Sequence, residues 1–168
     1  MARGRGAGRV ILVTDANIWI QLEDGGLVSK AFELGYELAA PDLIVDELGP
    51  RLGSQVLGLG LALLATGEEM DEAWQELRAR HNRPGDVDLY GLLHARLLSC
   101  RLITGDRHLR EAAEVEDVEV SGLLWLLDRM VESGVVPRRT ARTSLQAIRD
   151  RGARLPDGEC DRRMCEWG

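Results

Sequence analysis

The chain has 168 residues, of which 45% are hydrophobic and 29% charged, and its 21 basic and 28 acidic side chains give a formal net charge of -7. This length suits one compact domain, and the apolar fraction excludes an intrinsically disordered chain. No run of about 18 uncharged apolar residues is present, and the N-terminus lacks the features of a secretory signal, so we expect a cytoplasmic protein without a membrane span.

The charges are unevenly distributed along the chain. Residues 1–9 contain three Arg and no acid, whereas residues 137–168 contain eight Arg and five acids. We therefore predict a flexible Arg/Gly-rich N-terminal segment at 1–9, a folded domain at 10–136, and an Arg-rich C-terminal helix and tail at 137–168. Such Arg-rich ends are suited to binding phosphate or an acidic partner, although composition alone favours a plain solvated surface.

Strand and helix patterns alternate in the first half of the chain. The expected elements are a buried parallel strand at 10–14, helices at 16–23 and 27–34, a strand at 37–40 and a helix at 42–48. Gly49 and Pro50 are expected to end the last of these helices. Residues 56–65 are ambiguous between a strand and a buried helix, and their glycines favour a strand over about 59–64.

The alternation continues in the second half. The expected elements are helices at 68–80 and 86–99, a strand at 102–104, a helix at 107–114, a strand at 118–120, and helices at 122–132 and 137–151. Residues 153–168 are expected to form a tail with at most one helical turn. Alternating strands and helices predict an α/β sandwich around a mostly parallel sheet.

Several carboxylates follow the predicted strands. Asp15 comes directly after the first strand, Asp106 follows a later strand by two residues, and Glu47 lies in the helix after the second strand. Asp86 and Asp88 begin another helix. Because the carboxyl ends of parallel strands share one edge of a sheet, these acids can converge in one cleft. Their mutual repulsion favours binding of Mg²⁺ or Mn²⁺, and such a site suits phosphoryl chemistry.

Each acid also has a structural explanation, because most acids in a chain this acidic are solvated. Asp15 and Asp106 depart from that pattern, since a carboxylate after an apolar strand loses hydration unless it has a partner. Asp88 is equally explained by a favourable interaction with the helix dipole, and Asp86 by an N-cap. Glu47 is the weakest candidate, since other acids compete for its place: Glu33, Asp42 and Asp46.

The sequence lacks the key residues of several classes of protein that bind or transfer phosphate. Asn17 stands where an aspartate-nucleophile phosphatase needs a second Asp, and the only Lys, Lys30, is far from the late strand end that a receiver domain requires. The glycines at 4–8 precede the first strand, so they form no dinucleotide-binding loop. A P-loop is excluded because no Gly-Lys-Ser/Thr sequence is present.

Four short segments, in this order and spacing, resemble the PIN-domain nucleases. They are Val-Thr-Asp-Ala-Asn-Ile-Trp-Ile at 13–20, Pro-Asp-Leu-Ile-Val-Asp-Glu-Leu at 41–48, Asp-Leu-Tyr-Gly-Leu-Leu-His-Ala at 88–95 and Leu-Ile-Thr-Gly-Asp-Arg-His-Leu-Arg at 102–110. With the helix after Val120, the resemblance covers roughly residues 10–136. It implies a PIN-like three-layer α/β/α sandwich with a central, mostly parallel sheet.

The resemblance also implies a catalytic site. The acids that match those of the family are Asp15, Glu47, Asp88 and Asp106. Asp15, Asp88 and Asp106 are then the main metal ligands, and Glu47 completes the site. In PIN enzymes these acids bind Mg²⁺ or Mn²⁺, and RNA is cut by a water that the metal activates.

Five further residues are assigned supporting roles. Asn17 and Thr104 fall where the family has polar residues that support the metal, and Asp86 is an additional acid beside the matched one. Arg107 and Arg110, within about one helical turn of the last acid, are candidates to position phosphate. An exposed helix face explains both arginines equally well.

These features predict a metal-dependent endoribonuclease, and many PIN proteins of this size are VapC-like toxins of toxin–antitoxin pairs. Such toxins are often homodimers, and a small antitoxin inserts a segment into the acidic cleft. The apolar helix over 123–130 indicates burial in the core or at a dimer interface. Two alternatives are an RNA-processing or quality-control nuclease without an antitoxin, and a non-catalytic module that binds RNA or protein. The presence of all four acids argues against the non-catalytic module.

Overall fold

The computed structural model describes residues 8–168, so residues 1–7 of the predicted N-terminal segment lie outside the described part. Its centre is a five-stranded sheet with the order β3-β2-β1-β4-β5, in which all neighbouring strands are parallel. The strands are β1 (Ile11–Thr14), β2 (Glu37–Pro41), β3 (Ala62–Leu64), β4 (Arg101–Ile103) and β5 (Val120–Ser121). The predicted α/β fold with a parallel sheet is confirmed.

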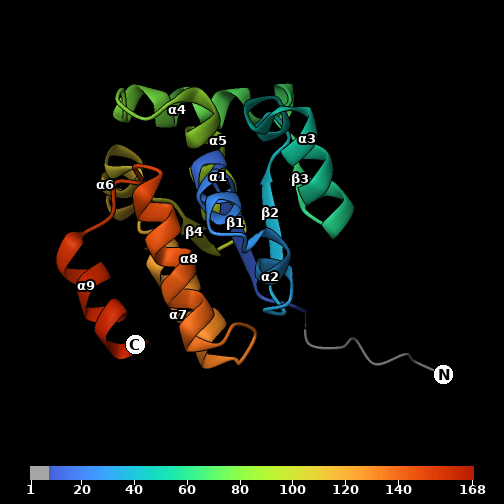
Figure 1. Ribbon diagram of the computed structural model, residues 1–168. Coiled ribbons are helices and arrows are strands. Elements are labelled where there is room, and N and C mark those ends of the chain that lie inside the picture. The colour runs from blue at the N-terminus through green and yellow to red at the C-terminus, as the bar shows by residue number, and fades with distance from the viewer. Residues whose placement is uncertain (1–7) are drawn as a thin grey trace.

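Helices cover both faces of the sheet (Figure 1). Buried residues of one face contact α1 (Ala16–Asp24), α2 (Val28–Phe32), α3 (Ile44–Leu59), α7 (Leu123–Glu132), α8 (Arg138–Asp150) and α9 (Asp157–Glu166). The other face packs against α4 (Asp71–Arg80), which follows the short 3-10 helix η1 (Glu68–Met70), and against α5 (Asp86–Leu97) and α6 (Arg107–Val115). None of the helices in this described part is long and apolar enough to cross a bilayer.

The strands are apolar on both sides because both sides are covered. In β1, Leu12 belongs to the core under α1 and α7, while its neighbour Val13 belongs to the core under α5 and α6. In β4, Ile103 and Leu102 divide in the same way. This alternation is why the strand segments are continuous apolar runs in the sequence.

The order of the strands creates a switch point between β1 and β4. From β1 the chain moves to β2 and β3 on one side, and it then returns to place β4 on the other side of β1. The connections after β1 and β4 therefore leave the sheet in opposite directions, which opens a crevice at the carboxyl ends of these two strands. Asp15 and Thr104 are the first residues after them.

The structure corrects the interpretation of residues 42–64. α3 does not end at Gly49 but continues to Leu59, with a kink where Gly49 adopts φ 76 and ψ 170. Pro50 follows the kink as the first residue of the second helical segment, where its missing N–H costs nothing. The strand expected over 59–64 contains only the last three of those residues, because the glycine-containing segment before it is helical.

We expect Gly49→Ala to destabilise the protein by about 1–3 kcal/mol, because this backbone conformation is strained for any residue with a Cβ atom. Gly58→Ala in the same helix is the matched control. Gly58 is helical and a Cβ atom there would meet no neighbour within 4 Å, so alanine should stabilise by about 0.5 kcal/mol. Urea unfolding of both variants measures the difference, and equal effects would contradict the assignment of the kink.

The C-terminal region is more ordered than the sequence patterns predict. Residues 153–168, expected to form a tail, contain the three-turn helix α9, and both Cys160 and Trp167 are buried in the core shared with α1 and α8. The apolar side chains of α7 also lie in that core, where Leu127 and Met130 are fully buried. Core packing therefore accounts for the apolar character of α7.

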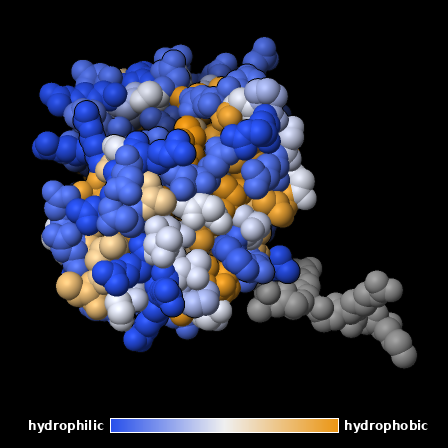
Figure 2. Space-filling view, in the orientation of Figure 1, coloured by the Kyte–Doolittle hydropathy of each residue, from blue (hydrophilic) through white to orange (hydrophobic). Residues whose placement is uncertain are grey.

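The surface is mostly hydrophilic in the view of Figure 2, with hydrophobic side chains gathered on the side of α3 and β3. The exposed leucines of these two elements are Leu57, Leu59 and Leu63. These leucines lie in β3 and in the part of α3 after the kink, whereas the predicted site residue Glu47 lies in the first turn of α3.

Candidate active site

Three helices begin at the carboxyl edge of the sheet, and each carries an acid at its start. Asp15 is the N-cap of α1, Asp106 is the N-cap of α6, and Asp88 lies in the first turn of α5. The N-terminus of a helix carries a partial positive charge and unpaired N–H groups, so it favours anionic groups. The local sequence therefore explains why each acid is tolerated where it stands.

Asp15 is held firmly by its neighbours. It is only 8% exposed, its Oδ1 accepts a hydrogen bond of 2.9 Å from the Ile18 N–H, and its Oδ2 accepts one from the Thr104 hydroxyl. The same hydroxyl oxygen accepts a hydrogen bond of 3.1 Å from the backbone N–H of Asp106. Thr104 thus connects the acid after β1 with the acid after β4, as a supporting residue would.

Asp88 faces Asp15 across a small cavity of about 10 Å³, which is lined also by Thr14, Pro41 and Gly91. The side chain of Asp88 is half-buried, and a Cβ atom added to Gly85 would lie 3.3 Å from its Oδ2. A cavity of this volume accommodates about one small species such as a water. The two acids therefore line one shared space.

The carboxylates at this edge influence one another. Burial, together with the nearby charges of Asp106 and Glu47, raises the pKa of Asp15 to about 6, although the hydrogen bonds from Thr104 and Ile18 oppose this shift. Burial also raises the pKa of Asp88 to about 6, with added repulsion from Asp15, Asp106 and Glu47. Four acids from four parts of the chain therefore form one electrostatic unit.

Glu47 interacts with Asp15 and Asp88 only through the electrostatic effect of its charge. It lies in the first turn of α3 and is exposed, so it borders the site from the β2 side. Two of its competitors are engaged elsewhere: Lys30 pairs with Glu33 at 3.0 Å, and Thr66 donates to Asp42 at 2.5 Å. Glu47 remains the best candidate among the acids of this region.

Asp86 is not brought to the other acids. Its side chain is 74% exposed and pairs with Arg78 of α4, with 2.5 Å between Oδ1 and Nη2. Its role as an N-cap is also not observed, since Gly85 occupies that position. The two acids of this turn therefore face different parts of the structure: Asp88 faces the site and Asp86 faces α4.

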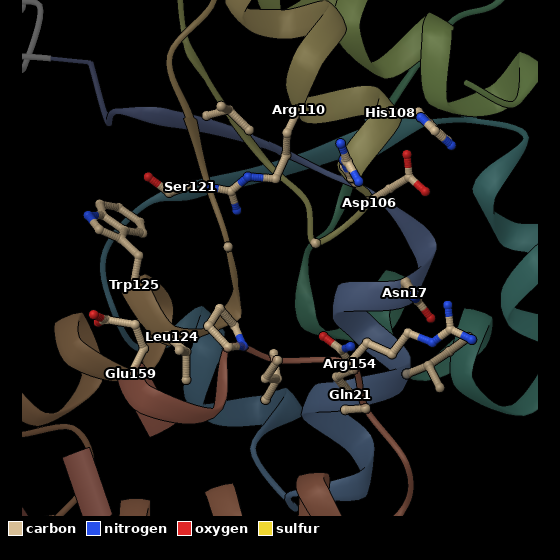
Figure 3. Close-up of a pocket in the computed structure, with 18 of the residues that line it drawn as sticks. Asn17, Gln21, Asp106, His108, Arg110, Ser121, Leu124, Trp125, Arg154 and Glu159 are labelled. Carbon is tan, nitrogen blue, oxygen red and sulfur yellow. The ribbon is translucent and has the colours of Figure 1, made fainter. Parts of the chain in front are cut away.

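A larger cleft of about 1,410 Å³ begins beside Asp106 and Asn17 (Figure 3). Arg107 and Arg110 both line it. Arg107 is exposed and its Nε donates to Glu111 at 2.8 Å, whereas the Nη1 of Arg110 donates to the Thr104 carbonyl at 3.3 Å. Arg110 is thus the arginine held beside the acidic edge.

Among the residues of this cleft that sequence reasoning missed are Gln21 and Arg154. Gln21 follows Asn17 by four residues, and that spacing places both side chains on the same face of α1. Arg154 carried no comparable signal, because its segment lies about 140 residues from Asp15 in the chain and was expected to be a tail.

The donor groups at this edge fit a hard divalent cation. They are carboxylate and hydroxyl oxygens, the ligands that Mg²⁺ and Mn²⁺ prefer, and the repulsion that raises the pKa of Asp88 is what a cation would relieve. As the side chains are oriented, no three His, Cys, Asp or Glu residues within 8–168 are grouped closely enough to hold a metal ion. Asp15 and Asp106 instead direct oxygens to the N–H groups that they cap.

The raised pKa of Asp88 predicts a pH-dependent stability. Between about pH 4 and pH 6 the folded protein binds more protons here than the unfolded chain, so this carboxyl lowers the free energy of unfolding as the pH rises. Asp88→Asn should therefore be more stable than the wild type at pH 7, by on the order of 1 kcal/mol after allowance for solvent screening, and equally stable near pH 4. Denaturant unfolding at both pH values, without divalent metal, measures this; a constant difference would contradict it.

Comparison with known proteins identifies the family to which the chain is similar. A family model described as DUF3368, PIN domain, matches residues 11–168. The matched residues include the sheet, the acidic edge and the two C-terminal helices. No curated protein matches the chain.

Proposed function

The chain belongs to the PIN-domain family, whose members are generally nucleases, and we propose that it is an endoribonuclease that uses Mg²⁺ or Mn²⁺ to hydrolyse RNA phosphodiester bonds. The observation that supports this most is the convergence of Asp15, Asp88, Asp106 and Glu47 at the switch point of the sheet, where burial and repulsion raise the pKa of two of them to about 6. Such strongly perturbed carboxyls in a crevice are typical of functional sites.

In this proposal each residue has a role that follows from its position in the site. Asp15, Asp88 and Asp106 would hold the cation, and Glu47 would complete the site from its exposed position on α3. A bound cation would neutralise these carboxylates, polarise the phosphate and lower the pKa of the attacking water. Thr104 fixes the orientation of Asp15, and Asn17 borders the site at the start of α1.

The substrate phosphate would lie against groups that favour an anion. The N-termini of α1, α5 and α6 face the same edge of the sheet and offer partial positive charge. Arg110, anchored on the Thr104 carbonyl, would contribute a full positive charge. A phosphodiester would therefore be held between the carboxylate-bound cation and these positive groups.

We expect RNA cleavage to depend entirely on a divalent cation. The measurement uses purified protein and a pool of structured and single-stranded RNA, with Mg²⁺, with Mn²⁺ and with a chelator in excess. Cleavage should be lost in the chelator and should return when either cation is added back, because without a cation the carboxylates would repel the phosphate and the water would keep its high pKa. Cleavage that persists in the chelator would argue against this site.

A role as a VapC-like toxin with a small antitoxin, and assembly as a homodimer, remain further proposals about this protein. The acidic crevice supports the toxin role, whereas the chain is longer than many such toxins. The dimer is now supported less by α7, since its apolar side chains pack within the chain. Sedimentation of the purified protein tests the dimer, and co-purification with the product of an adjacent small gene tests the antitoxin.

A further inference from the structure

The large cleft beside the acids is built by segments that are far apart in the sequence. One face of α1 lines it with Asn17, Ile20, Gln21 and Asp24, which are spaced as residues on one side of a helix. The opposite walls come from α6, from the start of α7 and from residues 151–156, which connect α8 to α9. Figure 3 shows these walls around a shared space.

The cleft leads away from the acidic edge along α1. Asn17 lies at the end where the acids are, and Asp24 lies at the other end of the helix. The separation of seven positions corresponds to about 10 Å along the helix axis. That distance is about three nucleotides at the stacked spacing of about 3.4 Å per strand position. The cleft is therefore long enough for a short stretch of strand beyond the bond at the acids.

Gln21 presents a polar atom that nothing in the described chain satisfies. The residue is 8% exposed, and its buried Oε1 has no hydrogen-bond partner within residues 8–168. A buried amide without a partner is costly, so such groups are usually completed by a ligand or an ordered water. A ribose hydroxyl or an amino group of an unpaired base would supply the missing donor.

Arg154 reaches the same part of the cleft from the C-terminal connection. This connection follows α8, which packs so closely on the end of α1 that a Cβ atom on Gly25 would lie 2.8 Å from Cδ1 of Ile148. The chain that leaves α8 therefore runs beside α1. Figure 3 shows the side chain of Arg154 extending toward Asn17, and so toward the acidic end of the cleft.

The arginines of the cleft differ in whether they are already paired. Arg107 pairs with Glu111 and Arg163 with Asp128, so their charges are compensated. In the described part of the chain, no carboxylate pairs with Arg110, Arg151 or Arg154. Arg110 is held at the Thr104 carbonyl, and Figure 3 shows Arg154 extending toward Asn17. These two guanidinium groups remain available for a phosphate, which they can bind with two parallel hydrogen bonds.

We propose that Arg154 and Gln21, together with Arg110, form a subsite for single-stranded RNA next to the carboxylates. Arg154 binds a phosphate adjacent to the scissile one, and Gln21 completes its hydrogen bonding on the ribose or base of the same nucleotide. The Arg-rich C-terminal region thereby supplies part of the substrate site. This inference rests on the proposed nuclease function but concerns binding, which can be measured without cleavage.

The test measures binding of a fluorescently labelled single-stranded RNA by anisotropy, in chelator and at several salt concentrations. The variants are Arg154→Gln, Gln21→Leu and Arg139→Gln, the last removing an equal charge from an exposed position on α8. Arg154→Gln should weaken binding about tenfold and reduce the slope of log K against log salt by about 0.7. Gln21→Leu should weaken binding without changing the slope, and Arg139→Gln should match the wild type.

Equal affinities for Arg154→Gln and Arg139→Gln would overturn the proposal. Tighter binding or faster cleavage by Arg154→Gln would also overturn it, because Arg154 would then obstruct the cleft. RNA binding that depends on Arg154, without cleavage in Mg²⁺ or Mn²⁺, would support the subsite while refuting the nuclease function. Metal-dependent RNA cleavage together with unchanged RNA binding in Arg154→Gln would support the nuclease function while refuting the subsite.

Discussion

Asp88→Asn should reduce RNA cleavage by at least about 100-fold, while the metal-free protein stays folded and becomes slightly more stable at neutral pH. The loss follows from removal of a carboxylate that faces Asp15 across the small cavity and would hold the cation. The gain in stability follows because a half-buried carboxyl with a pKa raised to about 6 is costly to ionise. Cleavage rates and unfolding curves of the same preparation measure both effects.

Asp86→Asn is the matched control for this prediction. It changes the same functional group two residues earlier, but Asp86 is exposed and pairs with Arg78. Its cleavage rate should stay within about twofold of the wild type, since an exposed ion pair contributes little. If Asp86→Asn abolished cleavage and Asp88→Asn did not, the assignment of the two acids would be reversed. If neither affected cleavage, the carboxylates at this edge would not be the catalytic site.

Arg163→Met should lower the free energy of unfolding by about 3 kcal/mol, the largest stability effect that we expect from a single polar side chain. Arg163 is buried, and its guanidinium donates to both carboxylate oxygens of Asp128 at 2.8 and 2.6 Å. It also donates to the carboxylate and the carbonyl of Glu159. Methionine keeps the aliphatic volume but leaves Asp128 without its partner, and breaking a buried pair on one side is strongly destabilising.

Arg162→Met serves as the control, since Arg162 is the adjacent residue of α9 and its side chain is 52% exposed. Its pairs with Glu159 and Glu166 lie on the surface, so its loss should cost less than about 0.5 kcal/mol. Guanidinium unfolding of both variants gives the comparison. Similar small effects would mean that α9 is not tied to α7 in solution, and the wall of the cleft formed by residues 151–156 would then lose its anchor.

The sequence alone determined the elements that define the fold. Apolar runs such as 10–14 and 102–104 lack a polar face, so they suit parallel strands that are covered on both sides. The acids after these strands stood out because a carboxylate that follows an apolar strand loses hydration unless it has a partner, and the structure shows that Asp15 and Asp106 also cap the following helices. Because parallel strands share one carboxyl edge, the sequence also indicated the edge of the sheet at which these acids would lie.

Tertiary structure alone decided which acids belong to the site. Asp86 and Asp88 stand two residues apart on α5, about 200° around the helix, so the sequence shows that they face apart but not which one faces the sheet edge. That choice depends on α4, which brings Arg78 to Asp86, and on β1, which brings Asp15 opposite Asp88. The same holds for α9 and Arg154, because a polar segment with few apolar residues gains its position only from the core against which Cys160 and Trp167 pack. Contacts between distant segments determine these features, and no local pattern encodes them.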